Sequence, residues 1–300
     1  MWKKLGRIFE LEEGVDSFLY SHAANPTALH ISGDLYRIFF NARNKENKSS
    51  VSSFLFDMNS LSSPPQEKPK LELPFGAENS FYSHGISIGN IYEIGSEKFM
   101  LFMGWQIRNN EHWRGDIGRI KILENGSLLV HPKEPFMSSD QEDPVSLSYP
   151  WVMHDSGEYK MWYGSTESWD SINGEMIHVI KSATSPDGEN WTRNGLAIPY
   201  EQGVAQAFSR PSVIKTESGY HCWYSYRSGD GTLYRIGYAH SANGINWKRK
   251  HDETGIDVSD SGWDSEMICY PFVFEHEGNR YMLYNGNGFG KSGIGLAIWE

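Results

Sequence analysis

Short segments with alternating apolar and polar residues recur along the chain, and turn residues separate them. The clearest are Tyr-Lys-Met-Trp-Tyr (159–163), Tyr-His-Cys-Trp-Tyr (220–224) and Arg-Tyr-Met-Leu-Tyr (280–284). Alternation with a period of two is typical of β-strands that are buried on one side. No segment of convincing length follows the 3.6-residue period of a helix. The pattern therefore predicts an all-β fold.

These three strands belong to one repeating unit. Each follows a strand that begins at a proline (Pro150, Pro211 or Pro271), and the interval to the central Trp or Leu is constant (162 − 150 = 223 − 211 = 283 − 271 = 12). The prolines are 61 and 60 residues apart (211 − 150, 271 − 211). Two weaker copies precede them, at 25–40 and 83–103. Five units of about 60 residues therefore account for the chain.

A turn motif completes the repeat. Ser-Pro-Asp-Gly-Glu-Asn-Trp (185–191) aligns with Ser-Ala-Asn-Gly-Ile-Asn-Trp (241–247), and Asp-Gly and Asn-Gly are tight-turn dipeptides. Each unit thus predicts a four-stranded antiparallel blade, and radial closure protects the strand edges. The last unit lacks this hairpin, so we expect the N-terminal strand around Arg7, Ile8 and Phe9 to complete it. The prediction is a single domain, residues 1–300, folded as a five-bladed β-propeller.

Composition narrows the classes of partner. Lys plus Arg is 27 and Asp plus Glu is 38, a formal charge of −11, which disfavours nucleic acid. The sequence has no apolar stretch long enough for a membrane span, and acids follow the basic residues at its start. We therefore expect no signal peptide, no membrane partner and a cytoplasmic location, with Cys222 and Cys269 as free thiols in apolar strands. The oligomeric state stays open.

Metal and cofactor motifs are not evident in the sequence. His, Cys and Asp residues show no convincing zinc spacing. The stretch Asn-Gly-Asn-Gly-Phe-Gly-Lys-Ser (285–292) is similar to a phosphate loop, but we expect a strand to follow it, whereas such a loop needs a helix N-terminus. We expect neither a metal nor a cofactor.

The blade motif resembles that of the five-bladed propeller carbohydrate-active enzymes: the arabinanase and xylosidase group, the invertase-like group and the mannoside phosphorylases. The similarity covers all five units. More narrowly, four segments resemble uncharacterised members found with bacterial surface-polysaccharide genes: Ser-Arg-Pro (209–211), Trp-Tyr-Ser-Tyr-Arg (223–227), Trp-Asp-Ser-Glu-Met (263–267) and Tyr-Asn-Gly-Asn-Gly-Phe-Gly (284–290). The resemblance implies a sugar substrate in a central funnel, where carboxylates from different blades act as acid, base or nucleophile.

The chain departs from that pattern of acids. The first unit has Asn25 where the resemblance implies an Asp before proline, and the fourth has Ser209 where it implies a Glu two residues before proline. Only the fifth unit has a strong acidic entry, with Asp264 and Glu266 on one face of an alternating segment. Asp143 stands in register with Asp264, seven residues before the shared proline (150 − 143 = 271 − 264). We expect Glu266, Asp264 and Asp143 as candidate catalytic residues.

Polar side chains stand three residues past the aligned aromatic of each second strand, and we expect them to form a ring around the ligand: Arg43, Gln106, Thr166, Arg227 and Asn287. His22, His84 and Arg210 enter inner strands and are expected to face the funnel. Trp105, Trp263 and Tyr226 are candidate sugar platforms, whereas the periodic Trp162, Trp191, Trp223 and Trp247 are expected in the core. The predicted substrate-binding residues are His22, Asn25, Arg43, His84, Trp105, Gln106, Tyr149, Arg210, Tyr226, Arg227, Trp263, Asn285 and Asn287.

Three functions remain open at this point. The first is an enzyme resembling glycoside hydrolases that uses carboxylate acid and base chemistry on a glycan, which is anionic or rich in hydroxyl groups. The second is a phosphorylase or glycosyltransferase that uses a phosphate-activated sugar, favoured by Arg and His where hydrolases keep acids. The third is a non-catalytic sugar-binding propeller, because a fold does not determine an activity.

Overall fold

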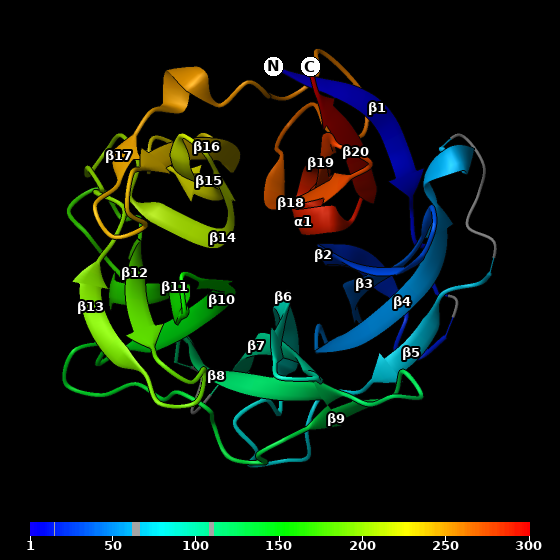
Figure 1. The fold of residues 1–300 in the computed structure, drawn as a ribbon, viewed down its shortest axis with the longest axis horizontal. Coiled ribbons are helices and arrows are strands. Elements are labelled where there is room, and N and C mark those ends of the chain that lie inside the picture. Colours follow the sequence, from blue (N-terminus) through cyan, green and yellow to red (C-terminus); the bar gives the residue numbers. More distant parts are fainter. Residues whose placement is uncertain (15, 62–66, 108–110) are drawn as a thin grey trace.

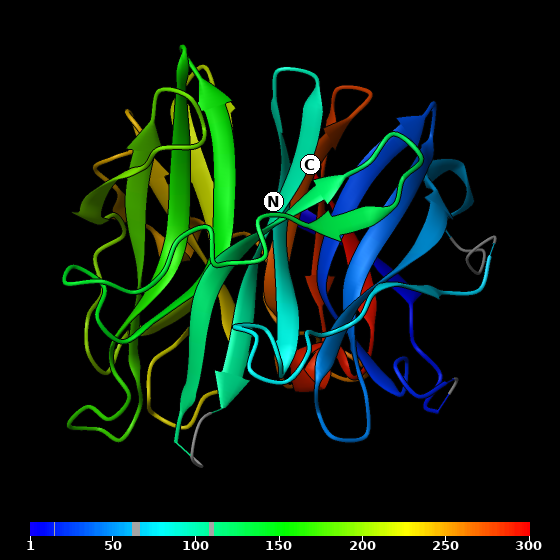
Figure 2. The same ribbon diagram turned by 90° about the horizontal axis from the view of Figure 1, so that it is seen from below.

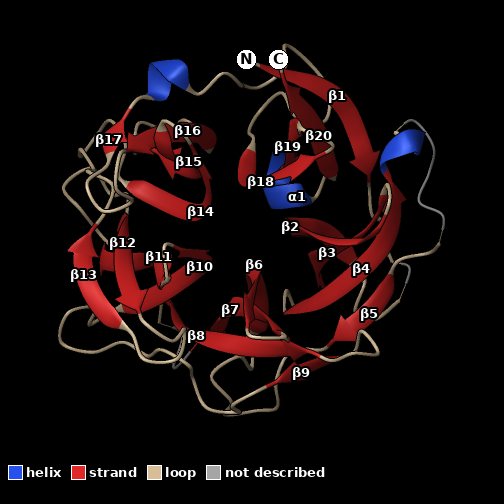
Figure 3. Cartoon of the chain, viewed as in Figure 1, coloured by secondary structure: helices blue, strands red, loops and turns tan. Residues whose placement is uncertain are grey.

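The computed structural model describes residues 1–14, 16–61, 67–107 and 111–300, and strands dominate it (Figures 1 and 3). The strands form groups around a central axis. The innermost strands are β2 (Ser21–Ser32), β6 (Gly85–Ile94), β10 (Ser146–Asp155), β14 (Ala207–Thr216) and β18 (Cys269–His276). The second strands are β3 (Leu35–Arg43), β7 (Glu97–Ile107), β11 (Glu158–Ser168), β15 (Gly219–Arg227) and β19 (Asn279–Asn285).

The remaining strands lie further from the axis (Figure 1). The third strands are β4 (Ser49–Asp57), β8 (Trp113–Ile122), β12 (Ile177–Ser185), β16 (Arg235–Ser241) and β20 (Ile294–Trp299). The fourth strands are β5 (Lys70–Leu73), β9 (Leu128–Val130), β13 (Thr192–Leu196), β17 (Lys248–Arg249) and β1 (Trp2–Phe9). Helix in the described residues is confined to two 3-10 turns, Met58–Ser60 and His251–Glu253, and to α1 (Asn287–Gly290).

Antiparallel pairing joins the strands of each unit in the order inner, second, third and fourth. Single parallel pairs then join two units into one sheet, between Ser49 and Gly85 and between His178 and Ala207. Seen from the side, the strands run through the depth of the molecule (Figure 2). The prediction of an all-β, propeller-type fold is confirmed.

The last unit combines strands from both ends of the chain. As predicted, the N-terminal strand β1 pairs with β20, with Trp2 opposite Trp299. This unit lies beside the first one (Figure 1), and Asn285 joins the two. Its amide oxygen accepts from the backbone N–H of Asn25 at 2.9 Å, and its amide nitrogen donates to the Ala23 carbonyl at 2.7 Å.

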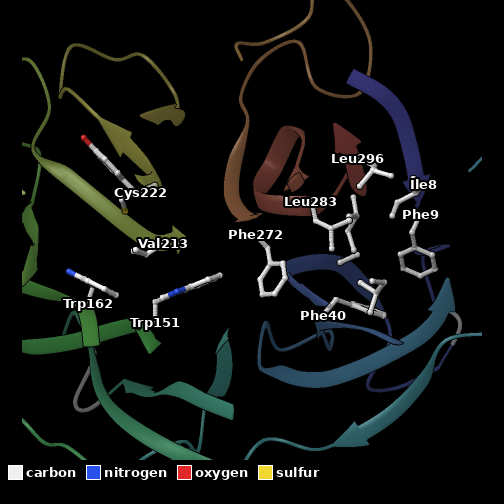
Figure 4. Close-up of a cluster of buried hydrophobic side chains, with 14 of the residues drawn as sticks. Ile8, Phe9, Phe40, Trp151, Trp162, Val213, Cys222, Phe272, Leu283 and Leu296 are labelled. Carbon is white, nitrogen blue, oxygen red and sulfur yellow. The ribbon is translucent and has the colours of Figure 1, made fainter. Parts of the chain in front are cut away.

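Repeated aromatic residues fill the core between units (Figure 4). Trp162, Trp223 and Trp247 are at most 4% exposed, which confirms their predicted core role, and Trp191 packs partly buried against a second cluster. The indole N–H groups of Trp162 and Trp247 both donate to the Gly244 carbonyl at 3.0 Å. Cys222 and Cys269 are buried free thiols, also as predicted. In the described part of the chain, no helix has the length and apolar character needed to cross a bilayer.

Candidate functional site

A cavity of about 350 Å³ lies where the innermost strands of all five units meet. Each inner strand contributes a lining residue: Asn25 from β2, Ser87 from β6, Tyr149 from β10, Ser209 from β14 and Tyr270 from β18. Most of the other lining residues come from the second and third strands and the loops between them. The other lining residues are Ala24, Asn41, Arg43, Asn47, Ser49, Met103, Trp105, Ile107, Trp113, Met176, His178, Phe208, Arg227, Tyr234 and Phe289.

A repeated backbone irregularity builds the floor of this cavity. Asn25, Tyr149, Arg210 and Tyr270 each precede the inner-strand proline, and each has a positive φ between 41° and 54°. The pairing register shifts at the same place in each strand. Such bulges redirect a side chain away from the regular strand face, and left-handed non-glycine residues cluster at functional sites. In β6 the equivalent residue is Gly89, where an added Cβ would lie 2.1 Å from the Pro150 carbonyl oxygen.

Arg210 reaches from β14 to the first unit and is not itself a lining residue, although the preceding Ser209 is. Its Nη2 donates to the Pro26 carbonyl oxygen at 2.7 Å and to Thr27 Oγ1 at 2.9 Å. Its Nε and Nη1 are buried without a hydrogen-bond partner in the described residues. Burial lowers the pKa of this guanidinium from 12.5 to about 9, so it is still charged at neutral pH.

Other polar atoms around the floor also lack partners among the described residues. Asn25 Oδ1 and Ser209 Oγ are both buried and unpaired. The hydroxyl groups of Tyr149 and Tyr270 lie 3.3 Å apart, which joins the third and fifth units across the axis. Buried polar groups are normally satisfied, so unpaired donors and acceptors at a cavity indicate a place for a ligand or for water.

Two further arginines lie in the walls. Arg43 Nη1 donates to Asn47 Oδ1 at 2.8 Å, and this partner is neutral. Arg227 pairs with Glu175 at 2.8 Å and lies 4.7 Å from the ring centroid of Tyr234. Five of the predicted substrate-binding residues line this cavity together: Asn25, Arg43, Trp105, Tyr149 and Arg227. Their role in binding stays a prediction.

The imidazole of His178 forms part of the wall in its neutral state. Its Nε2 lies 2.5 Å from Ser148 Oγ and its Nδ1 lies 2.8 Å from Thr166 Oγ1. Burial lowers its pKa from 6.5 to about 3. Thr166, expected in the polar ring, thus orients a cavity residue. The cavity gains no positive charge from this ring at neutral pH.

Aromatic rings occur at one side of the cavity. Trp105 lines it, and its indole N–H donates to Ser49 Oγ at 3.0 Å. Trp113 also lines it and packs edge-on against Trp169 with centroids 4.6 Å apart, while His112 stacks on Trp169 at 4.8 Å. Flat apolar rings beside hydrogen-bonding groups suit the C–H faces and hydroxyl groups of a pyranose.

The predicted catalytic acids lie elsewhere, since no Asp or Glu occurs among the described lining residues. Asp143 is fully buried and accepts from Tyr163 (2.8 Å) and Ser165 (2.6 Å), and it pairs with Lys181 and Arg193. Burial raises its pKa, but these hydrogen bonds and the Lys181 charge outweigh burial and lower the pKa below its usual value. The surroundings of Asp143 are those of a structural carboxylate.

Asp264 has the equivalent environment in the last unit. It accepts from the Tyr284 hydroxyl at 3.0 Å, as Asp143 does from Tyr163, and it pairs with Lys4 at 2.7 Å. Burial raises its pKa, and the bonds from Lys4 and Ser259 outweigh that effect and lower it. The geometry thus gives Asp264 and Asp143 a role in holding strands together. A catalytic role for either stays a prediction.

Glu266 differs from these two acids because it is exposed. Its backbone N–H donates to Asn287 Oδ1 at 2.9 Å, and its carbonyl accepts from Arg235 at 2.9 Å. Within the described chain, its carboxylate forms no hydrogen bond or ion pair. Asn287 therefore positions the loop that carries Glu266 and does not line the cavity. Asn285 does not line it either, because its side chain joins the first and last units.

Of the three predicted sugar platforms, Trp105 lines the cavity, and Tyr226 and Trp263 pack against other rings. Tyr226 stacks on His251 with centroids 4.1 Å apart, and Trp263 stacks on Tyr284 at 5.5 Å. An added Cβ on Gly286 would lie 2.5 Å from Trp263, so this ring is packed against the backbone. Neither residue lines the cavity, in contrast to Trp105.

His22, His84 and Gln106 lie outside the lining of the central cavity. His22 faces a shallow hollow beside Glu12 and Lys291, and burial lowers its pKa to about 4. His84 is half-buried, 5.9 Å from the Trp105 ring centroid. Gln106 lines a separate groove.

The placement of Gln106 in the polar ring was based on a wrong register. The sequence alignment of the repeats makes Met103 the equivalent of Tyr163. In the structure, Tyr163 lies opposite the bulge of its inner strand, and Leu101 is the residue opposite the bulge in the second unit. The repeat therefore places Gly104, two residues earlier, at the ring position.

Several lining residues were missed by the sequence reasoning: Asn41, Ser49, Trp113, His178, Tyr234, Tyr270 and Phe289. Tyr270 occupies the same repeat position as Tyr149, so that signal was available. Ser49 pairs with Arg43 and His178 with Thr166, so extending the register to the third strands would have identified both.

No family model matches the sequence. Two proteins of Mycobacterium tuberculosis, the uncharacterised proteins Rv1502 and MT1551, are each 38% identical over 307 aligned positions, covering 100% of this chain and 99% of the relative. Both are similar over their whole length.

Solved structures with a similar fold are much more distant in sequence. A glycoside hydrolase superposes with a TM-score of 0.73 at 13% identity, covering 99% of this chain and 91% of the other. A structure from the GH130 family of mannoside phosphorylases, described as containing hydrolases of β-1,2 mannosidic linkages in Candida mannan, gives 0.71 at 14%, covering 100% and 94%. A thermostable family-43 glycoside hydrolase gives 0.66 at 16%, covering 95% and 89%. These likenesses show the fold alone.

Proposed function

The chain belongs to the same protein family as Rv1502 and MT1551, and we propose that it is a carbohydrate-active enzyme whose sugar substrate binds in the central cavity. The cavity at the meeting point of the five inner strands carries the proposal. Solved glycoside hydrolases and mannoside phosphorylases have this fold, which supports a sugar ligand without fixing the reaction. We also propose that the five four-stranded units are the blades of one closed ring.

The lining of the cavity supports a sugar over an apolar ligand. Trp105 and Trp113 offer ring faces, and Asn25, Asn41 and Ser209 offer amide and hydroxyl groups. A ligand rich in hydroxyl groups needs both kinds of contact, because its C–H faces are apolar and its hydroxyls must keep hydrogen bonds. The proposed reaction is transfer or hydrolysis at a glycosidic bond.

Glu266 is our proposal for the acid or base. Asp143 and Asp264 are each held by a cation and a tyrosine, whereas the Glu266 carboxylate is exposed. Cleavage of a glycoside requires a carboxyl group that can give up and regain a proton. The loop of Glu266 is bound to Asn287, two residues before the cavity-lining Phe289.

A second candidate function is sugar binding without turnover. The specific observation in its favour is that the cavity lining described here contains no carboxylate. Hydrolases of this fold class need a pair of carboxyl groups on either side of the scissile bond.

The experiment that separates these functions measures binding and turnover on the same panel of aryl glycosides and oligosaccharides. We expect a bound sugar to raise the melting temperature, because only the folded chain binds it. Trp105→Ala should weaken binding roughly tenfold through loss of a ring face, whereas Trp299→Ala, at the chain end, should not. If no sugar of any kind binds, the proposal is wrong.

Turnover is tested with Glu266→Gln beside Glu217→Gln, an exposed glutamate in a turn. Loss of turnover by at least about a hundredfold in the first variant alone supports Glu266 as the acid or base. Cleavage that survives Glu266→Gln rules out that role. Binding without turnover by the wild-type chain favours the second candidate.

A further inference from the structure

Directly after the cavity-lining Ser209, Arg210 carries a buried positive charge with no counter-ion among the described residues. Arg210 is 1% exposed, and its described contacts are the Pro26 carbonyl and the Thr27 hydroxyl, both neutral. No described Asp or Glu forms an ion pair with it. Two of its donor groups, Nε and Nη1, are unpaired. An arginine in the interior normally has a carboxylate partner, since burial of an unpaired charge is unfavourable.

Among the described residues, Arg119 is a second buried arginine, and it shows how the charge of a structural arginine is compensated in this fold. Arg119 is 6% exposed, pairs with Glu189 at 2.7 Å and packs on the rings of Phe99 and Phe136. Its charge is therefore compensated within the chain. Arg210 lacks such compensation, although the same physical requirement applies to both.

A second charge lies near the first. Arg43 lines the cavity and donates to the neutral Asn47 side chain. Burial raises the pKa of the Tyr149 hydroxyl, and the positive charges of Arg43 and Arg210 both act in the opposite direction. Two arginines from the first and fourth units are thus close enough to Tyr149 to influence the same phenol.

The polar atoms beside Arg210 complete the pattern. Ser209 Oγ can donate to an oxyanion, and Asn25 Oδ1 can accept from a neighbouring hydroxyl group. Both residues line the cavity, directly before Arg210 and before its partner Pro26 in the chain. No described carboxylate lines the cavity, and Glu175, which contacts the lining residue Arg227, is paired with that arginine at 2.8 Å.

We propose that the central cavity is an oxyanion site, in which Arg210 and Arg43 hold the carboxylate or phosphate group of the bound sugar. Guanidinium groups bind both anions through paired N–H donors. The identification of the ligand as an acidic sugar rests on the proposed function. The site for the oxyanion itself rests on the arginines alone.

The test compares four probes by their effect on the melting temperature of the intact chain: glucose, glucuronate, glucose 1-phosphate and inorganic phosphate. We expect one or both charged sugars to raise it by roughly 5 °C or more at about a hundredfold excess over Kd, and neutral glucose to raise it less. A preference for glucuronate identifies the group as a carboxylate, and a preference for glucose 1-phosphate identifies it as a phosphate.

The variants are Arg210→Met, Arg43→Gln and the control Arg119→Met. We expect the first two to weaken binding of the charged sugar by about tenfold to a hundredfold, and the control to leave it unchanged. Arg210→Met should also keep or raise the melting temperature of the ligand-free chain, because it removes an uncompensated buried charge. Arg119→Met should lower that temperature.

Each outcome decides one claim. Equal shifts with neutral and charged sugars overturn the oxyanion site and leave the proposed function intact. A shift with inorganic phosphate and none with any sugar supports the oxyanion site and overturns the proposed function. If Arg210→Met lowers the ligand-free melting temperature as Arg119→Met does and still binds the charged sugar, Arg210 is purely structural. Arg43→Gln, on a partly exposed residue, keeps the test valid should Arg210→Met not fold.

Discussion

At the scale of single residues, His178 shows how the cavity wall keeps a titratable group neutral. Both ring nitrogens have hydroxyl partners, Ser148 and Thr166, and the side chain is buried. Burial lowers its pKa to about 3, far below the value of about 6.5 expected in the unfolded chain. Burial also lowers the pKa of His22, His221 and His251 to about 4.

These histidines predict a loss of stability in mild acid. Below about pH 6.5 the unfolded chain takes up protons that the folded chain does not, so the free energy of unfolding falls as the pH falls. For His178 alone the slope is about 1.4 kcal/mol per pH unit between about pH 6 and pH 4. Urea unfolding at pH 7, 6 and 5 measures it. His178→Gln, which can keep both hydroxyl contacts, should give a shallower slope, and parallel curves would contradict the prediction.

The acids show what residue type alone leaves undetermined. Asp143 and Asp264 occupy equivalent repeat positions, and the sequence alignment found that equivalence correctly. In the structure each carboxylate accepts from the tyrosine of its own unit and from a lysine, and a catalytic role for either stays a prediction. Those partners come from other strands, and no local sequence pattern reports their distance.

At the scale of elements, the hairpin motif folds the same way in both copies. Ser185 Oγ accepts from the Gly188 N–H at 2.8 Å, and Ser241 Oγ accepts from the Gly244 N–H at 2.9 Å. Both glycines have a φ of 75°. The turn was predictable because its side chain, backbone and glycine requirements are all local.

Gly195 and Gly244 have nearly the same φ, and we expect their replacement by Ala to lower the free energy of unfolding by different amounts. The Cβ added by Gly195→Ala would have no atom within 4 Å. This substitution should therefore lower the free energy of unfolding only through the strain of a left-handed alanine, by about 1 kcal/mol. Gly244→Ala has a similar φ, but its Cβ would lie 3.3 Å from Trp162 and Tyr220, so it should cost at least about 2 kcal/mol. Urea unfolding of both variants checks this. Equal losses would show that the Trp162 packing adjusts freely.

The inner strands show where the sequence repeat stops predicting the strand register. Where Pro follows the bulge residue, as at Tyr149, Arg210 and Tyr270, the register could be read from the sequence. The second unit has Gly89 followed by Asn90, and there the alignment slipped by two residues. Asn90 still bonds to the Val152 backbone on the next inner strand (2.7 Å), so the tertiary position is kept without the proline.

At the scale of the whole molecule, two ends of one chain meet in a single sheet. Residues 1–9 and 269–299 pair in one unit, and Asn285 binds the first inner strand. The sequence predicted this arrangement because one strand was missing from the last repeat. It did not predict the cavity lining fully, because that surface combines residues from eleven strands, three loops and α1, and the loop residues follow no repeat pattern.

Lys4 is the residue on which this meeting of the termini most clearly depends. It pairs with Asp264, whose side chain is 3% exposed, while the neighbouring Lys3 pairs with Glu300 on the surface. Lys4→Met leaves a buried carboxylate without its cation, and we expect a loss of about 3 kcal/mol in unfolding free energy. Lys3→Met removes an exposed pair and should change it by no more than about 0.5 kcal/mol.

The pH dependence of the Lys4→Met variant tests the physical cause. In the native chain the pKa of Asp264 is held below its usual value, so the pair contributes above about pH 4 and is lost as the pH falls through the lowered pKa. The gap between native and Lys4→Met chains should therefore be widest at neutral pH and close as the pH falls through the lowered pKa of Asp264. A gap that does not change with pH would mean that the Lys4 stem holds β1 by packing, and that the charge of Asp264 has no part in joining the termini.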